Sequence, residues 1–224
     1  MFAAAIIGHT RLMPLASLFR CLMPQRRIGG VFLAALLLSV VTSPGKAEDG
    51  EAGEWTAGAY SFSDEMGGFI IESVSGKGTH GDPVVLTETL NSSSPVTLVI
   101  RSVWPIRPFD SAALYDNGVL YMRIVARNGS GQGWVEFEFE LQELLHKASV
   151  FGDGLSFDQR SLRKDNISSD TFAEFSRDFE PYDKLLFRHG KVDPGKSAGF
   201  SFLITDFTPR PKFYLVQDPR IPSS

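Results

Sequence analysis

Apolar and polar residues alternate with a period of two along much of the chain after residue 55. Between Val135 and Leu141, apolar residues at every second position are separated by Glu136, Glu138 and Glu140. Such alternation is typical of a β-strand with one buried face and one polar face. The same criteria predict further strands over 68–74, 83–90, 96–103, 119–127, 184–188, 198–207 and 212–217.

Turn-forming residues separate these segments. Gly, Pro and Asn clusters stand where the alternation stops, and Asn128-Gly129 lies between two clear strands, which predicts a hairpin. Strands divided by turns at about ten-residue intervals indicate a sandwich or a barrel. We therefore expect an all-β fold, a single antiparallel β-sandwich of about eight strands, with a barrel as the alternative.

Two short helical segments are expected beside the strands. Phe172, Phe175 and Phe179 follow a helical spacing, and Ser169 stands where it could cap a helix over 170–179. Residues 142–147 could add one helical turn. Segments this short would cover one end of a sheet and would not form a layer of their own.

The first 47 residues differ in charge and pattern from the rest. They contain five basic residues and no acid, and the first acid is Glu48. Two arginines precede an apolar run over 28–41, which is shorter than the roughly 20 residues of a membrane-spanning helix. Small residues at Gly45 and Ala47 complete the order of a secretory signal peptide. The expected organisation is a signal peptide over 1–47, a flexible acidic tail over 48–54 and a β-sandwich domain over 55–224.

Cleavage after Ala47 would send the domain to the periplasm or outside the cell, with no stable membrane span. An uncleaved N-terminal anchor is the alternative, and Met13 or Met23 could be the true start in place of Met1. Cys21, the single cysteine, lies in the predicted leader. The mature chain would then lack disulfides, thiolate nucleophiles and cysteine-bound zinc.

Removing the leader also changes the charge. The whole chain has 22 basic and 26 acidic residues, and loss of the five leader bases leaves 17 against 26, a net charge of −9. Nucleic acids and anionic lipids attract basic surfaces, so neither is expected as a partner.

The segment 104–109 is the candidate ligand-binding site. Trp104 is followed by two prolines that flank Ile106 and Arg107, which makes the segment extended and excludes it from a central strand. A tryptophan displayed beside Arg107 could stack on a sugar or on a partner's side chain. The alternative is a tryptophan that folds back onto the end of the sandwich.

Carboxylates offer two weaker candidates. Asp153 and Asp158 stand in a polar, glycine-containing stretch that could place oxygen ligands around a calcium ion. Calcium is the one cofactor that the sequence suggests, although the spacing of these residues matches no EF-hand. A solvated loop is the alternative. The glutamates of 136–140 would point outward from one strand face, so a solvated or edge-protecting face is expected there, and no glycosidase pair.

Recognisable catalytic motifs are missing from the sequence. His80, His146 and His189 stand in unlike contexts without metal-ligand spacing, and we expect them in turns or on the surface. No serine stands in a nucleophile elbow.

One stretch supports a family resemblance. The run from Ile124 through Trp134 to Gly154, the run 193–202 and the segment 213–217 resemble the β-sandwich domains of secreted bacterial proteins, including the PEP-CTERM-sorted kind. The likeness covers about half of the mature chain. The shared motifs are structural, so the resemblance implies a fold and no functional residues. The chain departs from that family because it ends in Arg220-Ile-Pro-Ser-Ser224 without a sorting helix, which argues against surface attachment by that route.

These observations favour an exported, non-catalytic binding or structural module of the bacterial envelope or extracellular matrix. The expected partner is a polysaccharide or an envelope protein. The alternatives are a periplasmic hydrolase with an unrecognised carboxylate site, and a periplasmic assembly factor that offers an exposed strand edge.

Overall fold

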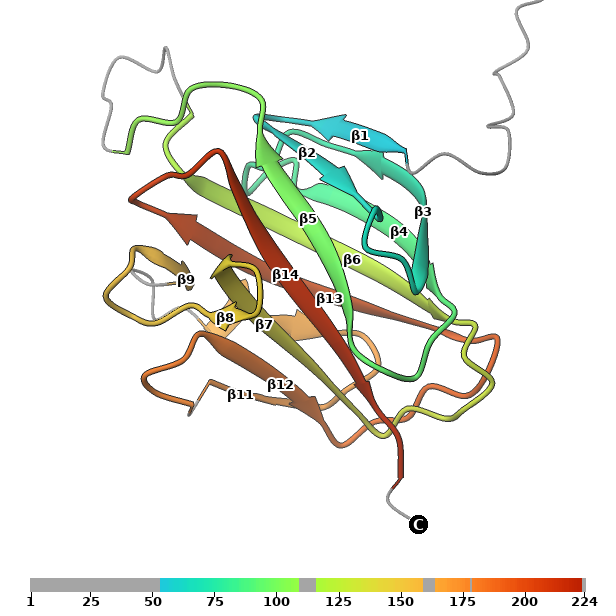
Figure 1. Cartoon of the computed structure of the whole chain (residues 1–224). Coiled ribbons are helices and arrows are strands. Elements are labelled where there is room, and N and C mark those ends of the chain that lie inside the picture. Colours follow the sequence, from blue (N-terminus) through green and yellow to red (C-terminus); the bar gives the residue numbers. More distant parts are fainter. Residues whose placement is uncertain (1–52, 109–115, 159–163, 178, 223–224) are drawn as a thin grey trace, which may run out of the picture. The chain divides into compact units, whose positions relative to one another are not determined.

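The computed structural model describes residues 53–108, 116–158, 164–177 and 179–222, which form two packed β-sheets (Figure 1). The predicted leader and residues 48–52 of the predicted tail lie outside the described residues. Glu54, which the sequence assigns to the tail, pairs with Ser63 and begins the first strand. None of the helices formed by the described residues is long and apolar enough to cross a membrane.

The first sheet contains, in spatial order, β1 (Glu54–Ala57), β2 (Tyr60–Ser63), β5 (Val96–Ser102), β14 (Lys212–Arg220), β7 (Glu136–Leu144), β12 (Lys184–Arg188) and β11 (Glu174–Ser176), and β8 (Lys147–Ala148) pairs with β7. The second sheet contains β10 (Ser168–Ser169), β13 (Ser197–Asp206), β6 (Val119–Asn128), β4 (Val84–Leu90) and β3 (Phe69–Ser75), and β9 (Leu155–Phe157) pairs with β13. All of the predicted strands are present. Neither sheet closes on itself, so the sandwich is confirmed and the barrel is excluded.

One strand pair departs from the expected antiparallel arrangement. β4 and β6 run parallel, with Leu86 opposite Ile124. A parallel pair needs a crossover connection of a dozen or more residues. The chain between β4 and β6 supplies one by passing through β5 in the other sheet.

Phenylalanine rings fill the space between the sheets. Phe137 and Phe139 of β7 are fully buried, and the Phe137 ring lies 4.6 Å from that of Phe200 on β13. The Phe139 and Phe202 rings are 4.9 Å apart. The period-two pattern of β7 therefore has the predicted consequence, with its apolar face turned to the opposite sheet.

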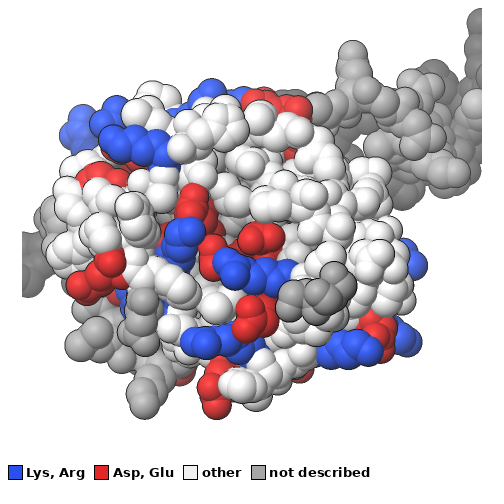
Figure 2. Space-filling model, turned by 60° about the horizontal axis from the view of Figure 1, so that its bottom comes forward, with Lys and Arg blue, Asp and Glu red and all other residues white. Residues whose placement is uncertain are grey.

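The acidic face of β7 is not the solvated stripe that the sequence predicts. Glu138 is only 6% exposed, because Lys184 of β12 and Arg220 of β14 cover it, with nitrogen–oxygen distances of 3.2 and 2.6 Å. Lys184 also pairs with Glu140 at 2.5 Å. β7 lies between two strands that supply cations, so Glu138 and Glu140 are ion-paired. Figure 2 likewise shows acidic and basic side chains interspersed over one face of the molecule.

The helix predicted over 170–179 is wrong. Ser169 does accept hydrogen bonds from the amides of Thr171 and Phe172, as a cap would. The chain then continues extended into β11, which pairs with β12. The Phe172 ring stacks on Phe200 at 5.7 Å, so pairing and core contacts override the helical spacing.

The other local predictions that fail involve turns. The predicted helical turn over 142–147 is the end of β7 and a tight connection to β8. The hairpin predicted at Asn128-Gly129 is wrong because β6 and β7 belong to different sheets. Asn128 is buried, and its amide donates to the carbonyl of Val192 at 3.0 Å, so it fixes the corner where the chain changes sheet.

A polar pair connects the sheets inside the core. Glu88 of β4 and Gln217 of β14 are both fully buried, and Gln217 Nε2 donates to Glu88 Oε2 at 3.1 Å. Among the described residues, neither Glu88 Oε1 nor Gln217 Oε1 has a hydrogen-bond partner. Burial raises the pKa of Glu88 to about 8, against the effect of the Gln217 hydrogen bond and with a smaller contribution from Asp64. Glu88 is therefore protonated at neutral pH.

Candidate functional site

The segment predicted to bind a ligand lies in the connection between β5 and β6. Trp104 is 63% exposed, so the alternative in which its ring folds back onto the sandwich is wrong. The backbone holds the segment in place: the Val103 amide donates to the Ala59 carbonyl at 2.9 Å, and the Arg107 amide to the Asp116 carbonyl at 2.7 Å. Arg107 is also exposed. A ligand-binding role for Trp104 and Arg107 stays a prediction.

The two aspartates predicted for calcium have different surroundings. Asp153 accepts hydrogen bonds from the Ser149 hydroxyl at 2.8 Å and from the amides of Val150 and Leu155 at 2.9 and 3.0 Å. Its carboxylate thereby organises its own loop. Asp158 is buried and accepts from the Asn166 amide at 3.2 Å. Over the described ranges, no three or more His, Cys, Asp or Glu side chains are grouped to hold a metal ion, and calcium binding stays a prediction.

The three histidines of the predicted mature chain are exposed, as expected. His146 and His189 adopt positive φ angles of 64° and 58° in connections between strands. The His80 ring packs edge-on against Tyr121 at 5.2 Å. Turn and surface roles are confirmed for this group.

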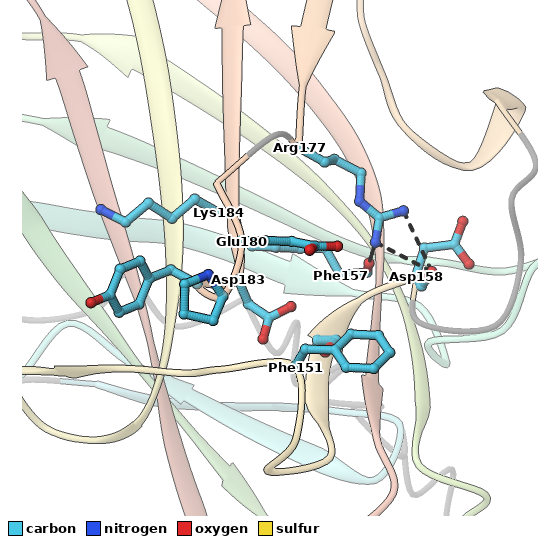
Figure 3. Close-up of a pocket in the computed structure, with 10 residues that line it drawn as sticks. Phe151, Phe157, Asp158, Arg177, Glu180, Asp183 and Lys184 are labelled. Carbon is cyan, nitrogen blue, oxygen red and sulfur yellow. Dashed lines mark hydrogen bonds between the residues drawn. The ribbon is translucent and has the colours of Figure 1, made fainter.

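A cleft of about 360 Å³ opens where the chain leaves β8, passes through β9 and later approaches β12 (Figure 3). Its walls come from residues 151–158 and 177–184, which are far apart in the sequence. Backbone bonds join the two walls: the Phe151 amide donates to the Pro181 carbonyl at 3.1 Å and the Asp183 amide to the Ser149 carbonyl at 3.0 Å. The two walls are thus held together by the main chain, independently of any ligand.

Aromatic side chains line the cleft at different depths. Phe151 is 62% exposed and Tyr182 is 50% exposed, whereas Phe157 is buried. Large apolar rings at a protein surface lose favourable burial, and rings exposed beside a cavity can contact a ligand that enters it. A volume of this size also falls in the ordinary range for small-molecule sites.

The two basic residues of the cleft are bound to other groups of the protein. The Arg177 guanidinium donates to the backbone carbonyls of Phe157 and Asp158, and Figure 3 shows it spanning that side of the cleft. The Lys184 ammonium forms the ion pairs with Glu138 and Glu140 on the outer face of β7. Burial lowers the pKa of Lys184, but the hydrogen bond and charge of these glutamates outweigh it and leave that pKa raised.

Two carboxylates lie at the opening of the cleft. Glu180 is exposed, and Asp183 is half-buried with its carboxylate directed into the space beside Phe151 (Figure 3). Burial raises the pKa of Asp183 to about 6; the Ser156 hydroxyl and Arg177 work against this shift, and the charge of Asp153 adds to it. Asp183 therefore changes charge slightly below neutral pH.

The structure places one predicted site residue in this cleft and leaves the others outside. Asp158 lines the cleft, whereas Asp153, Trp104 and Arg107 do not. The sequence pattern does not reveal the other residues of the cleft. It predicts a helix up to residue 179, and the turn that follows is not recognised as part of a site. The sequence contains one signal that could have found the site. Tyr182 follows a proline in a polar segment, and the segment 104–109 likewise combines aromatic residues with prolines.

Comparisons of this chain with protein-family models, with curated proteins and with solved structures found no match. The resemblance to PEP-CTERM-type sandwich domains stays a prediction.

Proposed function

We propose that this protein is an exported, non-catalytic glycan-binding module that holds a saccharide in the cleft between Phe151 and Tyr182. The observation that supports this most is the pair of half-exposed aromatic rings beside a polar-lined cavity. A pyranose has an apolar C–H face and a rim of hydroxyls. The aromatic rings can stack on the C–H face. The carboxylates of Glu180 and Asp183 can accept hydrogen bonds from the hydroxyls.

Alanine substitutions test where the glycan binds. We expect Phe151→Ala and Tyr182→Ala each to weaken binding of N-acetylglucosamine hexamer or cellohexaose about tenfold, because losing one stacked ring costs about 1.4 kcal/mol. Isothermal titration calorimetry measures the affinities. Trp104→Ala is the matched control, an equally exposed ring outside the cleft, and should bind like the wild type. Loss of binding in Trp104→Ala alone would transfer the site to the 104–109 segment.

A hydrolase is the second candidate, and the raised pKa of Asp183 is the observation that favours it. Glycosidases pair one protonated carboxyl with one ionised carboxylate across the scissile bond. Asp183 and Glu180 share the cleft and could supply such a pair.

Release of reducing ends separates the two candidates. For a non-catalytic module we expect wild-type protein and Asp183→Asn to leave the same hexasaccharides intact during prolonged incubation at pH 5 and 7. Turnover by the wild type that disappears in Asp183→Asn, while binding persists, would establish the hydrolase and overturn the non-catalytic proposal.

A further inference from the structure

The charge of the cleft decides which glycans it can accept. Of the basic side chains that line it, Arg177 is bound to the main chain of Phe157 and Asp158, and Lys184 is paired with two glutamates of β7. Binding a uronate or sulfate through either cation would break these bonds first. Among the described residues, the cleft therefore offers no preorganised cation to an acidic sugar.

The carboxylates of Glu180 and Asp183 are bound differently from the basic side chains of the cleft. Glu180 is exposed, and it takes part in none of the ion pairs formed by the described residues. The Asp183 carboxylate is directed into the cavity (Figure 3). Carboxylates that line one cleft repel an anion and attract a cation.

The aromatic walls favour the same sign of charge. A cation over the face of a Tyr or Phe ring is attracted by the ring quadrupole, and Phe151 and Tyr182 both expose about half of their surface or more. An ammonium group on a sugar could then contact a carboxylate and a ring together. A neutral acetamido group would keep the stacking but lose the charge contact.

We propose that the cleft selects glycans that carry free amino groups, as in glucosamine polymers, over their N-acetylated counterparts, and rejects uronate polymers. This inference rests on the proposed glycan-binding function and names its ligand class. It is carried by the engaged Arg177 and Lys184, the carboxylates of Glu180 and Asp183 that line the cleft, and the two exposed rings.

Three hexasaccharides of equal length test the selection by calorimetry at pH 7: glucosamine hexamer, N-acetylglucosamine hexamer and galacturonate hexamer. We expect the glucosamine hexamer to bind at least tenfold more tightly than its acetylated form, and the galacturonate hexamer not to bind. In the double variant Glu180→Gln, Asp183→Asn, the tenfold preference should fall to about twofold, while the affinity for the acetylated hexamer is retained.

A control variant separates the cleft from the overall negative charge of the protein. Glu72→Gln combined with Asp82→Asn removes the same charge from exposed positions that do not line the cleft, and should keep the full preference. If no hexasaccharide binds, the proposed function fails. If the hexasaccharides bind but the acetylated or galacturonate form binds as well as the glucosamine form, or the control variant loses the preference, only the selection proposed here fails.

Discussion

Replacing Glu88 by glutamine should stabilise the protein above pH 7 and remove the largest single contribution to its stability loss with rising pH. Gln217 Nε2 already donates to Glu88 Oε2, while Glu88 Oε1 and Gln217 Oε1 lack partners among the described residues. A proton on Glu88 Oε1 could bond Gln217 Oε1 and satisfy both oxygens. The amide of a glutamine at position 88 would supply the same donor at every pH.

The direction of the pH effect follows from the raised pKa of Glu88. Its ordinary value is 4.5, and the folded protein raises it to about 8. Between these values the unfolded chain has lost the proton that the native chain keeps, so stability is full below pH 4.5 and falls as pH rises to about 8. The slope from one such group is about 1.4 kcal/mol per pH unit. Asp206, with a pKa raised to about 7 chiefly by burial, adds a smaller loss of the same sign.

Urea unfolding of the wild type and Glu88→Gln at pH 5, 7 and 9 measures this effect. The two proteins should differ least at pH 5 and most at pH 9. Glu88→Ala is the control: at pH 5 it should lower stability by about 2–4 kcal/mol, because it leaves a cavity and an unpaired Gln217 side chain. This deficit should shrink toward pH 9, because the variant also lacks the carboxyl group that ionises in the wild type. A wild-type stability that stays constant from pH 5 to 9 would contradict the assignment of a protonated Glu88.

Phe200→Ala should be among the most destabilising single substitutions in the core. The Phe200 ring of β13 lies 4.6 Å from Phe137, 5.0 Å from Phe187 and 5.2 Å from Phe139, which all belong to the opposite sheet. It also lies 5.7 Å from Phe172 in the connection between β10 and β11. Removing a fully buried phenylalanine costs about 3–5 kcal/mol. Chemical unfolding gives the difference directly.

Ile70→Ala provides the comparison for Phe200→Ala. Ile70 lies on the edge strand β3 and is 56% exposed, so its truncation should change stability by about 0.5 kcal/mol or less. Similar losses in the two variants would show that the phenylalanine cluster does not hold the sheets together.

The strands of five or more residues could be predicted because their pattern is local. In β4 the residues Val84, Leu86 and Leu90 form a buried face, and Glu88 stands on that same face by simple alternation. The sequence therefore already contains the signal of a buried acid. What it does not contain is the partner, because Gln217 lies on another sheet and 129 positions away.

The helix over 170–179 failed for a related reason. Its phenylalanine spacing and its capping serine satisfy local helix criteria, but Phe175 instead lies opposite Phe187 in the β11–β12 pair. A few hydrogen bonds to a neighbouring strand and contacts with buried rings outweigh a weak local preference in so short a segment.

The candidate cleft shows what local patterns omit. Phe151 and Tyr182 come from separate connections, and their proximity depends on the bridge between Val150 and Tyr182. By itself, the sequence determined the longer strands, their buried faces and the acidic balance of the domain, because side-chain alternation and charge are properties of neighbouring residues. Only the tertiary structure decided which strands share a sheet, which acids are buried or ion-paired and where a cleft opens, because these depend on contacts between residues far apart in the chain.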